Sequence, residues 1–428
     1  MAETDQEGRQ QARQALFEGA LCTSVEEGAA VSPRDAQDAA PKASARAVTL
    51  NLITGGFGIG MFSLPWSLAG ASLLPGVLTI LLVVLVNAWT VSILIAAAEK
   101  HQAFDLGSLL SYLPGRASGP AQILTNAAVW LVLFVSQVGY VIVMAGAVTS
   151  VAGDTVFKDR SAAVALVSAA VLPLCFLDQR YLSFTSGFSV LVNLFVFAVI
   201  SGQPRKPAGL CYVGAGLGTL SMISVMMQSI VVQMCVLPMY QELECRTPAK
   251  FRQVVRHSFG ALSIIFVAFA VMGYVTYGEG VGSNILDALP DNAWGNAARV
   301  AAGLSVAGVY PIFEQAMVAP IWNMQGLRHR RPLYTLATVV TVSLILLVAL
   351  FVTSIGFLNV LNGAFCSIIF VGLCPSLVGL QLLERRSCAW RAGMYALLAL
   401  GTLSGILGMI FTDNYSKDLM RSCGWRSS

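Results

Sequence analysis

The stretch "NLITGGFGIGMFSLPW", residues 51–66, decides the fold of this chain. It carries four glycines between Gly55 and Gly60, followed by Pro65, in a run that is otherwise apolar enough for a buried helix. Glycine and proline are the residues least compatible with a helix interior. At membrane depth, a broken helix leaves N–H and C=O groups unpaired and is tolerated only where it lines a cavity. The stretch therefore predicts a membrane helix that unwinds beside a cavity.

The composition of the whole chain is that of a membrane protein. Of its 428 residues, 56% are hydrophobic and 11% are charged, whereas soluble domains carry about 25% charged residues. Apolar runs long enough to cross the lipid bilayer, roughly 20 residues, recur along the sequence. We therefore predict an all-α polytopic membrane protein with eleven membrane-spanning helices. Their expected ranges are 47–69, 73–98, 121–152, 161–177, 182–201, 212–240, 256–277, 295–323, 333–354, 357–383 and 391–412.

The ends of the chain and the basic residues predict its domains and orientation. Residues 1–46 are rich in charged and small residues and lack the apolar core of a signal peptide, so we expect a disordered cytosolic tail. Residues 47–412 form the predicted transmembrane domain, and residues 413–428 a short non-cytosolic tail. In this arrangement 18 of the 26 lysines and arginines face the cytosol, as the positive-inside rule requires. The C-terminus is then extracellular or lumenal, in either the plasma membrane or an acidic organelle membrane.

Several function classes are disfavoured by what the sequence lacks. The nine cysteines show no CxxC spacing and no pairing with histidine, so we expect no metal site and interpret most of them as small apolar fillers. No nucleophile–base pair stands out within the spans, so we predict neither an enzyme nor a bound cofactor. The basic clusters are accounted for by topology alone, so we expect no nucleic-acid partner.

A second broken helix is expected if the chain contains inverted repeats. Secondary transporters often carry discontinuous helices at matching positions of two such repeats. If spans 1–5 and 6–10 are the repeats, span 6, "SMISVMMQSIVVQMCVLPMYQEL" at 221–243, should be broken as well. It has no central glycine, but it places polar residues at membrane depth before Pro238. This pattern fits either a break or an ordinary helix kinked by proline.

Five motifs, in order along the chain, resemble those of the amino acid/auxin permease family. They are "GIGMFSLPWSLAGA" (58–71), "VLPMYQELECRTPAKFRQVVRHS" (236–258), "GYVTYGEGVGSNILDALP" (273–290), "VYPIFEQAMVAP" (309–320) and "NGAFCSIIFVGLCPSLVGLQL" (362–382). The resemblance covers residues 47–384. It implies a LeuT-like fold of 5+5 inverted repeats with an eleventh transmembrane helix, and an amino acid as the substrate.

The same resemblance implies a substrate site. Freed N–H groups at the start of a half-helix favour a carboxylate. The matching carboxylate cradle comprises Gly56, Phe57, Gly58, Ile59 and Gly60, and Thr54 and Gly55 lead into it. Ser229, Val232 and Gln233 of span 6 are the predicted contacts for the ammonium and the side chain, and Tyr140 of span 3 is predicted to reach the site. The alternatives are that the glycines only allow close helix packing and that Tyr140 only packs.

The coupling ion is less well defined. Sodium-coupled relatives carry an asparagine where this chain has Thr54, and a hydroxyl residue in the part of span 8 where it has Ala307 and Val309. This departure makes a Na⁺ site doubtful and leaves H⁺ coupling or passive exchange. Glu314 lies one turn after Tyr310 in span 8, and a carboxylate there is either a proton site or a structural group.

Glu242 matches a family glutamate at the cytosolic end of span 6. It is predicted to pair with Arg246 or Lys250 as a gate or brace.

We therefore predict a secondary active transporter of small or medium neutral amino acids that works by alternating access with H⁺ as the coupling ion. The alternatives are a membrane amino acid sensor with little flux, and a sodium-coupled amino acid symporter.

Overall fold

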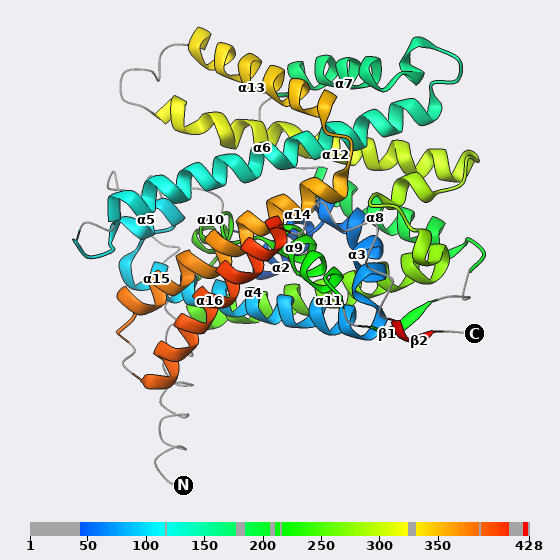
Figure 1. The fold of residues 1–428 in the computed structure, drawn as a ribbon. Helices are drawn as coiled ribbons and strands as arrows, with labels where there is room; N and C mark the ends of the chain where they lie inside the picture. The colour runs from blue at the N-terminus through cyan, green and yellow to red at the C-terminus, as the bar shows by residue number, and fades with distance from the viewer. Residues whose placement is uncertain are drawn as a thin grey trace.

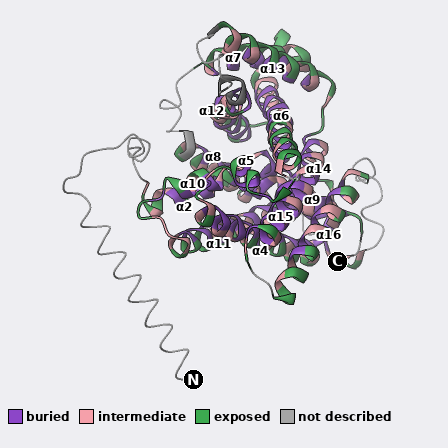
Figure 2. Ribbon diagram, turned by 90° about the vertical axis from the view of Figure 1, so that its left-hand side faces the viewer, coloured by how far each residue is buried: buried purple, intermediate pink, exposed green. Residues whose placement is uncertain are grey.

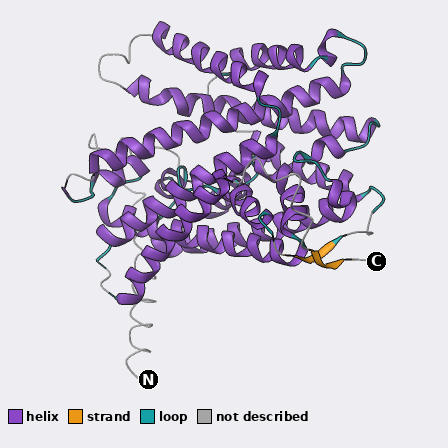
Figure 3. Ribbon diagram, viewed as in Figure 1, coloured by secondary structure: helices purple, strands orange, loops and turns teal. Residues whose placement is uncertain are grey.

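The computed structural model describes residues 43–115, 118–176, 185–205, 210–214, 216–323, 331–384, 387–410 and 423–426. Helices dominate the described residues (Figures 1 and 3), which confirms the predicted all-α class. In chain order they are α2 (Ala45–Gly55), η1 (Ile59–Ser63), α3 (Leu64–Ala71), α4 (Leu73–His101), α5 (Leu106–Ser111), α6 (Ser118–Val151), η3 (Val156–Lys158), α7 (Arg160–Leu174), α8 (Thr185–Ser201), α9 (Gly218–Ile230), α10 (Val236–Gln241), α11 (Pro248–Tyr277), η5 (Gly278–Gly280), η6 (Ile285–Ala288), α12 (Ala293–Asn323), α13 (Arg331–Phe351), α14 (Ile355–Cys366), the π-helix η7 (Ser367–Leu373), α15 (Cys374–Gln381) and α16 (Cys388–Ile410).

Most predicted helices lie within a few residues of an observed one, with two clear differences. Residues 212–240, expected as one helix, form part of strand β1 (Cys211–Gly214) and the two short helices α9 and α10. The helix expected from residue 256 already begins at Pro248, because the Thr247 side chain accepts a hydrogen bond from the Lys250 N–H at 3.1 Å and proline suits the first helical turn.

Length and apolarity identify the helices that can cross a membrane. Among the described residues there are six, or seven if α2 and the following η1–α3 segment count as one bent span. Helices α7, α8 and α9 are apolar but shorter. The prediction of eleven crossings is therefore not confirmed as a number.

The helices divide into a buried centre and a periphery (Figure 2). In the most apolar 18-residue stretch of α6, 78% is buried inside the molecule, whereas the corresponding share is 28% in both α13 and α16. Because α13 and α16 are nevertheless strongly apolar, their exposed faces suit contact with lipid. The central helices α6, α9 and α14 are the ones that surround the site described below.

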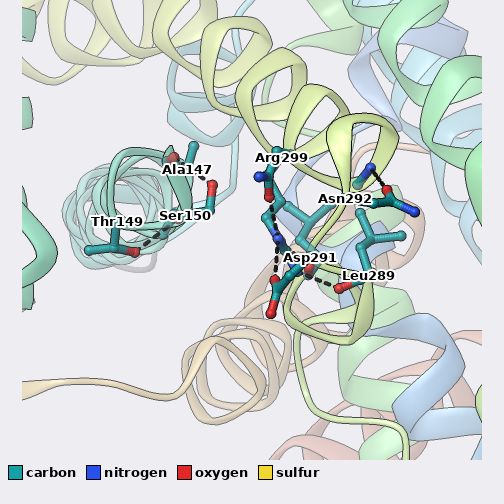
Figure 4. Close-up of polar contacts among 11 residues, drawn as sticks. Ala147, Thr149, Ser150, Leu289, Asp291, Asn292 and Arg299 are labelled. Carbon is teal, nitrogen blue, oxygen red and sulfur yellow. Dashed lines mark hydrogen bonds and ion pairs between the residues drawn. The ribbon is translucent and has the colours of Figure 1, made fainter. Parts of the chain in front are cut away.

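The loop between α11 and α12 is fastened by one arginine of α12 (Figure 4). Arg299 is 8% exposed. Its guanidinium donates to the Leu286 carbonyl at 3.0 Å, to Asp291 Oδ1 at 2.9 Å and also to the Leu289 carbonyl. The five donors of arginine form a rigid fork that suits several acceptors at once. Its role is therefore to hold this loop against the bundle.

A disulfide joins two distant parts of the chain. Cys211 and Cys423 are bonded across the antiparallel pair of β1 and β2 (Cys423–Arg426). The interpretation as apolar fillers is wrong for these two cysteines and for Cys245, which is also disulfide-bonded. It fits the buried free thiols of Cys175, Cys366 and Cys374.

The predicted tails fall mostly outside the described residues. Of the N-terminal tail, residues 43–46 are described, and Ala43 is hydrogen bonded to the backbone after α10. Of the C-terminal tail, only residues 423–426 are described. The cytosolic and non-cytosolic assignments of these tails stay predictions.

Candidate binding site at two broken helices

The first predicted break is present. Helix α2 ends at Gly55 and η1 begins at Ile59, and the two halves of the span meet at an angle of 47°. Gly58 is extended at φ −80° and ψ 177°, and a Cβ atom on it would meet nothing within 4 Å. The first N–H groups of a helix have no intrahelical acceptor. The start of η1 therefore presents N–H groups without an intrahelical acceptor, next to the open space at Gly58.

A second break lies at the matching place in span 6. Helix α9 ends at Ile230, and α10 begins at Val236. The Val232 carbonyl closes the intervening turn by accepting hydrogen bonds from the N–H of Cys235 and Val236. Pro238 lacks an N–H group, so it cannot donate the backbone hydrogen bond that a continuous helix through this position needs. Of the two interpretations of this span, the broken helix is the one observed.

The two breaks are in direct contact. A Cβ atom on Gly60 would overlap Ser229 Oγ and would lie 3.2 Å from Ser229 Cα. Gly60 therefore permits the close approach of η1 and α9, which is the packing role that the sequence left open for the glycines. Gly58 has no such neighbour among the described residues, so packing does not account for a glycine at that position.

Uncharged polar side chains join the second break to α6 and α14. Gln228, in the last turn of α9, donates to Ser136 Oγ at 3.2 Å. Asn362 of α14 donates to the same Ser136 Oγ at 3.0 Å. One turn earlier on α14, Asn359 donates to Ser63 Oγ at 2.8 Å and to the Ile59 carbonyl at 3.4 Å. Both breaks are thus held by neutral groups.

Gln233 is turned toward α4. Its amide nitrogen donates to Asn87 Oδ1 at 2.8 Å and to Thr90 Oγ1 at 2.9 Å, and all three side chains are fully buried. The Gln233 oxygen has no hydrogen-bond partner in the described part of the chain. The nitrogen therefore positions the broken segment of span 6, and the oxygen is the polar atom of this side chain that these contacts leave unused.

Glu314 lies in a second buried polar cluster, between α12 and α6. It is 1% exposed, and one carboxyl oxygen accepts a hydrogen bond from Gln137 Nε2 at 2.8 Å. Within the described ranges, the other carboxyl oxygen and the Tyr310 hydroxyl have no hydrogen-bond partner. Tyr140 packs nearby against Phe313, with ring centroids 5.5 Å apart. A carboxyl group that is buried without a cationic partner is costly at membrane depth.

Two predicted residues make other contacts than expected. The Thr54 hydroxyl donates to the Leu50 carbonyl of the preceding turn at 2.8 Å. The expected pairing of Glu242 with Arg246 or Lys250 is not found among the ion pairs of the described residues, and both bases make other contacts. Arg246 lies 3.8 Å from Glu99 and over the Phe104 ring, and Lys250 donates to the Glu244 carbonyl at 2.6 Å.

The polar residues that hold the site together were not predicted from the sequence. These are Asn87, Thr90, Ser136, Asn359 and Asn362. The available signal was a polar side chain inside an apolar run, since polar residues within membrane spans usually face other helices.

The first comparison with known proteins is at the level of the family. Residues 41–412 match the family model described as "Transmembrane amino acid transporter protein".

Two similar proteins have names that describe amino acid transport. "Amino acid transporter AVT6E" of Arabidopsis thaliana is 27% identical over 55% of this chain. The matched part spans about half of that protein's length, 53%. "Putative sodium-coupled neutral amino acid transporter 11" of Danio rerio is 21% identical over 88% of this chain and 87% of its own.

Solved structures agree on the fold. MhsT in complex with L-phenylalanine has a TM-score of 0.51 at 12% identity, with 86% of this chain and 98% of that chain covered. A mutant of the Eremococcus coleocola manganese transporter has a TM-score of 0.53 at 12% identity, with 88% and 93% covered. At this identity the likeness concerns the fold alone, which is LeuT-like as expected. The breaks, the apolar helices and the family match over most of the sequence lead to one conclusion: the chain is a multi-pass integral membrane protein that belongs to the transmembrane amino acid transporter family, whose members are transporters and not enzymes.

Proposed function

We propose that this transporter carries neutral amino acids by alternating access and couples their movement to protons through Glu314. The substrate class is inferred from the contact between the two breaks at Gly60 and Ser229. Among the described residues, the side chains that are hydrogen bonded around this contact are uncharged. A zwitterion supplies both of its own charges. Its carboxylate suits the first N–H groups of η1, which have no intrahelical acceptor, because helix N-termini favour anions.

The predicted site residues take their roles within this proposal. The cradle, Gly56 to Gly60, binds the carboxylate, with Thr54 and Gly55 at its entrance. Ser229 and Val232 border the substrate from span 6. The uncharged surroundings favour a neutral side chain, in keeping with the word "neutral" in the name of the Danio rerio relative.

Proton coupling rests on the surroundings of Glu314. Its hydrogen-bond partner Gln137 is neutral, and its second carboxyl oxygen is unpartnered among the described residues. Such a group can hold a proton in one state of the transport cycle and release it in another, once water or a new donor reaches it. In this proposal Tyr310 and Tyr140 line the path between the carboxyl group and the first break.

Sodium coupling has less support from the residues of this chain. The Thr54 hydroxyl is bonded to its own helix, and Ala307 and Val309 offer no side-chain oxygen. We therefore do not propose sodium coupling for this chain, although the names of some relatives include the term "sodium-coupled".

The distribution of lysine and arginine supports a cytosolic N-terminus and a C-terminus on the opposite side. This orientation is part of the proposal.

The test is uptake of labelled L-alanine and L-leucine into proteoliposomes, with either a pH gradient or a sodium gradient. We expect the pH gradient alone to drive accumulation. Glu314→Gln, which keeps the hydrogen bond to Gln137, should abolish this accumulation but retain exchange of internal for external substrate. Glu244→Gln, at an exposed position, is the matched control and should behave as wild type.

Three results would contradict the proposal. Accumulation driven by sodium and insensitive to pH would exclude proton coupling. Unchanged proton-driven accumulation in Glu314→Gln would exclude this residue as the proton site. Tight binding of amino acids without flux would favour the sensor alternative.

A further inference from the structure

Helix α14 places two asparagines beside the first break. Asn359 and Asn362 are three residues apart and so lie on one face of the helix. Their exposures are 0% and 1%. An amide buried this deeply in a membrane protein needs partners for both its nitrogen and its oxygen.

The nitrogen of each amide is fixed by a backbone carbonyl. Asn359 Nδ2 donates to the Ile59 carbonyl, and Asn362 Nδ2 donates to the Val132 carbonyl at 3.1 Å. Because a carbonyl can only accept, these contacts determine which end of each amide is nitrogen. The oxygens must then point to other groups.

Neither amide oxygen accepts a hydrogen bond in the described part of the chain. Oδ1 of Asn359 and Oδ1 of Asn362 are buried without a hydrogen-bond donor among the described residues. Each asparagine thus donates through its nitrogen, and its oxygen accepts no hydrogen bond from the described residues. Two unused acceptors are left on one face of α14. The ligand that suits such a pair carries donors or positive charge and no acceptor, which describes an ammonium group or an alkali-metal ion.

The charge of the surroundings separates these two ligands. The hydrogen-bond partners of the two asparagines are neutral oxygens, contributed by Ile59, Ser63, Val132 and Ser136. A metal ion bound there would keep an unbalanced charge at membrane depth. An amino acid brings its own carboxylate, whose carbon lies about 2.5 Å from the ammonium nitrogen by bond geometry. Asn359 contacts the carbonyl of the residue at which η1 begins, so an ammonium bound by its amide oxygen would lie beside the cradle that binds the carboxylate.

We propose that Asn359 and Asn362 form an acceptor pair that binds a cationic group, the α-ammonium of the amino acid substrate. This inference rests on the proposed function and adds α14 to the substrate site. It assigns the ammonium to span 10, in addition to the span-6 contacts predicted from the sequence.

The test compares ligands with and without an ammonium group. The probes are L-leucine with 4-methylpentanoate, and L-alanine with propanoate. Binding to purified full-length protein in detergent is measured by the rise in unfolding temperature with ligand concentration. The variants are Asn359→Ala and Asn362→Ala. The control is Asn193→Ala, a buried asparagine of α8 whose nitrogen donates to the Ser189 carbonyl.

We expect each α14 variant to bind the amino acids about tenfold or more weakly, because a charge-assisted hydrogen bond is lost. Affinity for the two carboxylates should stay the same, and Asn193→Ala should leave the ratio of affinities unchanged. This pattern would support the pair as the ammonium site, since general loosening of the fold would weaken both kinds of ligand alike.

Three results would overturn the inference or its basis. Equal weakening of amino acids and carboxylates would mean that the asparagines are structural. Recovery of amino acid affinity in the variants when sodium or potassium chloride replaces choline chloride would assign the pair to a metal ion. Absence of amino acid binding to the wild type would overturn the proposed function itself, and this inference with it.

Discussion

Replacement of Gly58 by valine separates a binding role of the glycines from a packing role. Gly58 has φ and ψ values that every residue adopts, and a Cβ atom there meets nothing within 4 Å. The substitution should therefore change the free energy of unfolding by no more than about 0.5 kcal/mol. The valine side chain would instead occupy the open space at the start of η1, where the substrate carboxylate is proposed to bind.

The expected loss of binding follows from the contacts that valine would exclude. Displacing the carboxylate removes at least two charge-assisted hydrogen bonds, each worth about 1.5–3 kcal/mol. The sum, about 3–6 kcal/mol, corresponds to a reduction of roughly 10²- to 10⁴-fold in affinity. Uptake at micromolar substrate should accordingly fall to background.

Gly60→Ala is the matched contrast. Its new Cβ would overlap Ser229 Oγ and crowd Ser229 Cα, and overpacking of this kind costs about 1–3 kcal/mol. We expect less folded protein, with partial recovery in the double variant Gly60→Ala/Ser229→Gly.

The amount of folded protein and the rate of transport are measured in the same cells. Size-exclusion chromatography of a fluorescent fusion gives the amount of folded protein, and uptake of labelled L-leucine gives transport. Wild-type uptake by Gly58→Val at normal expression would refute the cradle. Poor folding of Gly58→Val would contradict the open space on which the prediction rests.

Three further predictions concern the loop and the disulfide. Arg299→Lys should destabilise the protein by about 1–3 kcal/mol, because lysine cannot satisfy the same set of acceptors, and the unfolding temperature would show it. Cys423→Ser should destabilise it by about 2–5 kcal/mol, and an unchanged unfolding temperature would contradict this. Burial raises the pKa of Asp287 above 3.8, although the Arg299 charge and a hydrogen bond from Asn284 lower it in part. The folded state therefore binds this proton more tightly than the unfolded state, so stability should fall as pH rises from about 4 through the raised pKa, and Asp287→Asn should remove that slope.

The sequence was most informative where a local rule was broken. Four glycines clustered in an apolar run are hardly compatible with a continuous helix, so the break near Gly58 was predictable from one stretch. The break in span 6 was less clear, since its turn has no glycine and depends on Pro238 together with contacts to η1 and α4. The family resemblance supplied the fold, which periodicity alone would not distinguish from another helical membrane protein.

Residues whose role depends on distant partners were not predictable. Asn359 and Asn362 read as isolated polar residues until α14 is placed against Ile59 and Val132. Glu242 illustrates the reverse error: a base lies four residues away in sequence, but Arg246 instead contacts Glu99 of α4. Sequence spacing reports neighbours on one helix, whereas these contacts arise between helices.

The bond between Cys211 and Cys423 has a consequence for the biogenesis of the protein. Its two cysteines are 212 residues apart, and α9 to α16 all lie between them. During synthesis the bond cannot form until the last of these helices has been inserted and the segment after it has reached the side of β1. A chain whose misinserted helices leave Cys423 on the opposite side of the membrane from Cys211 cannot form this bond. The disulfide would thus distinguish correctly inserted chains from misinserted ones, and its formation would be a late step by which a cell could recognise a completed transporter.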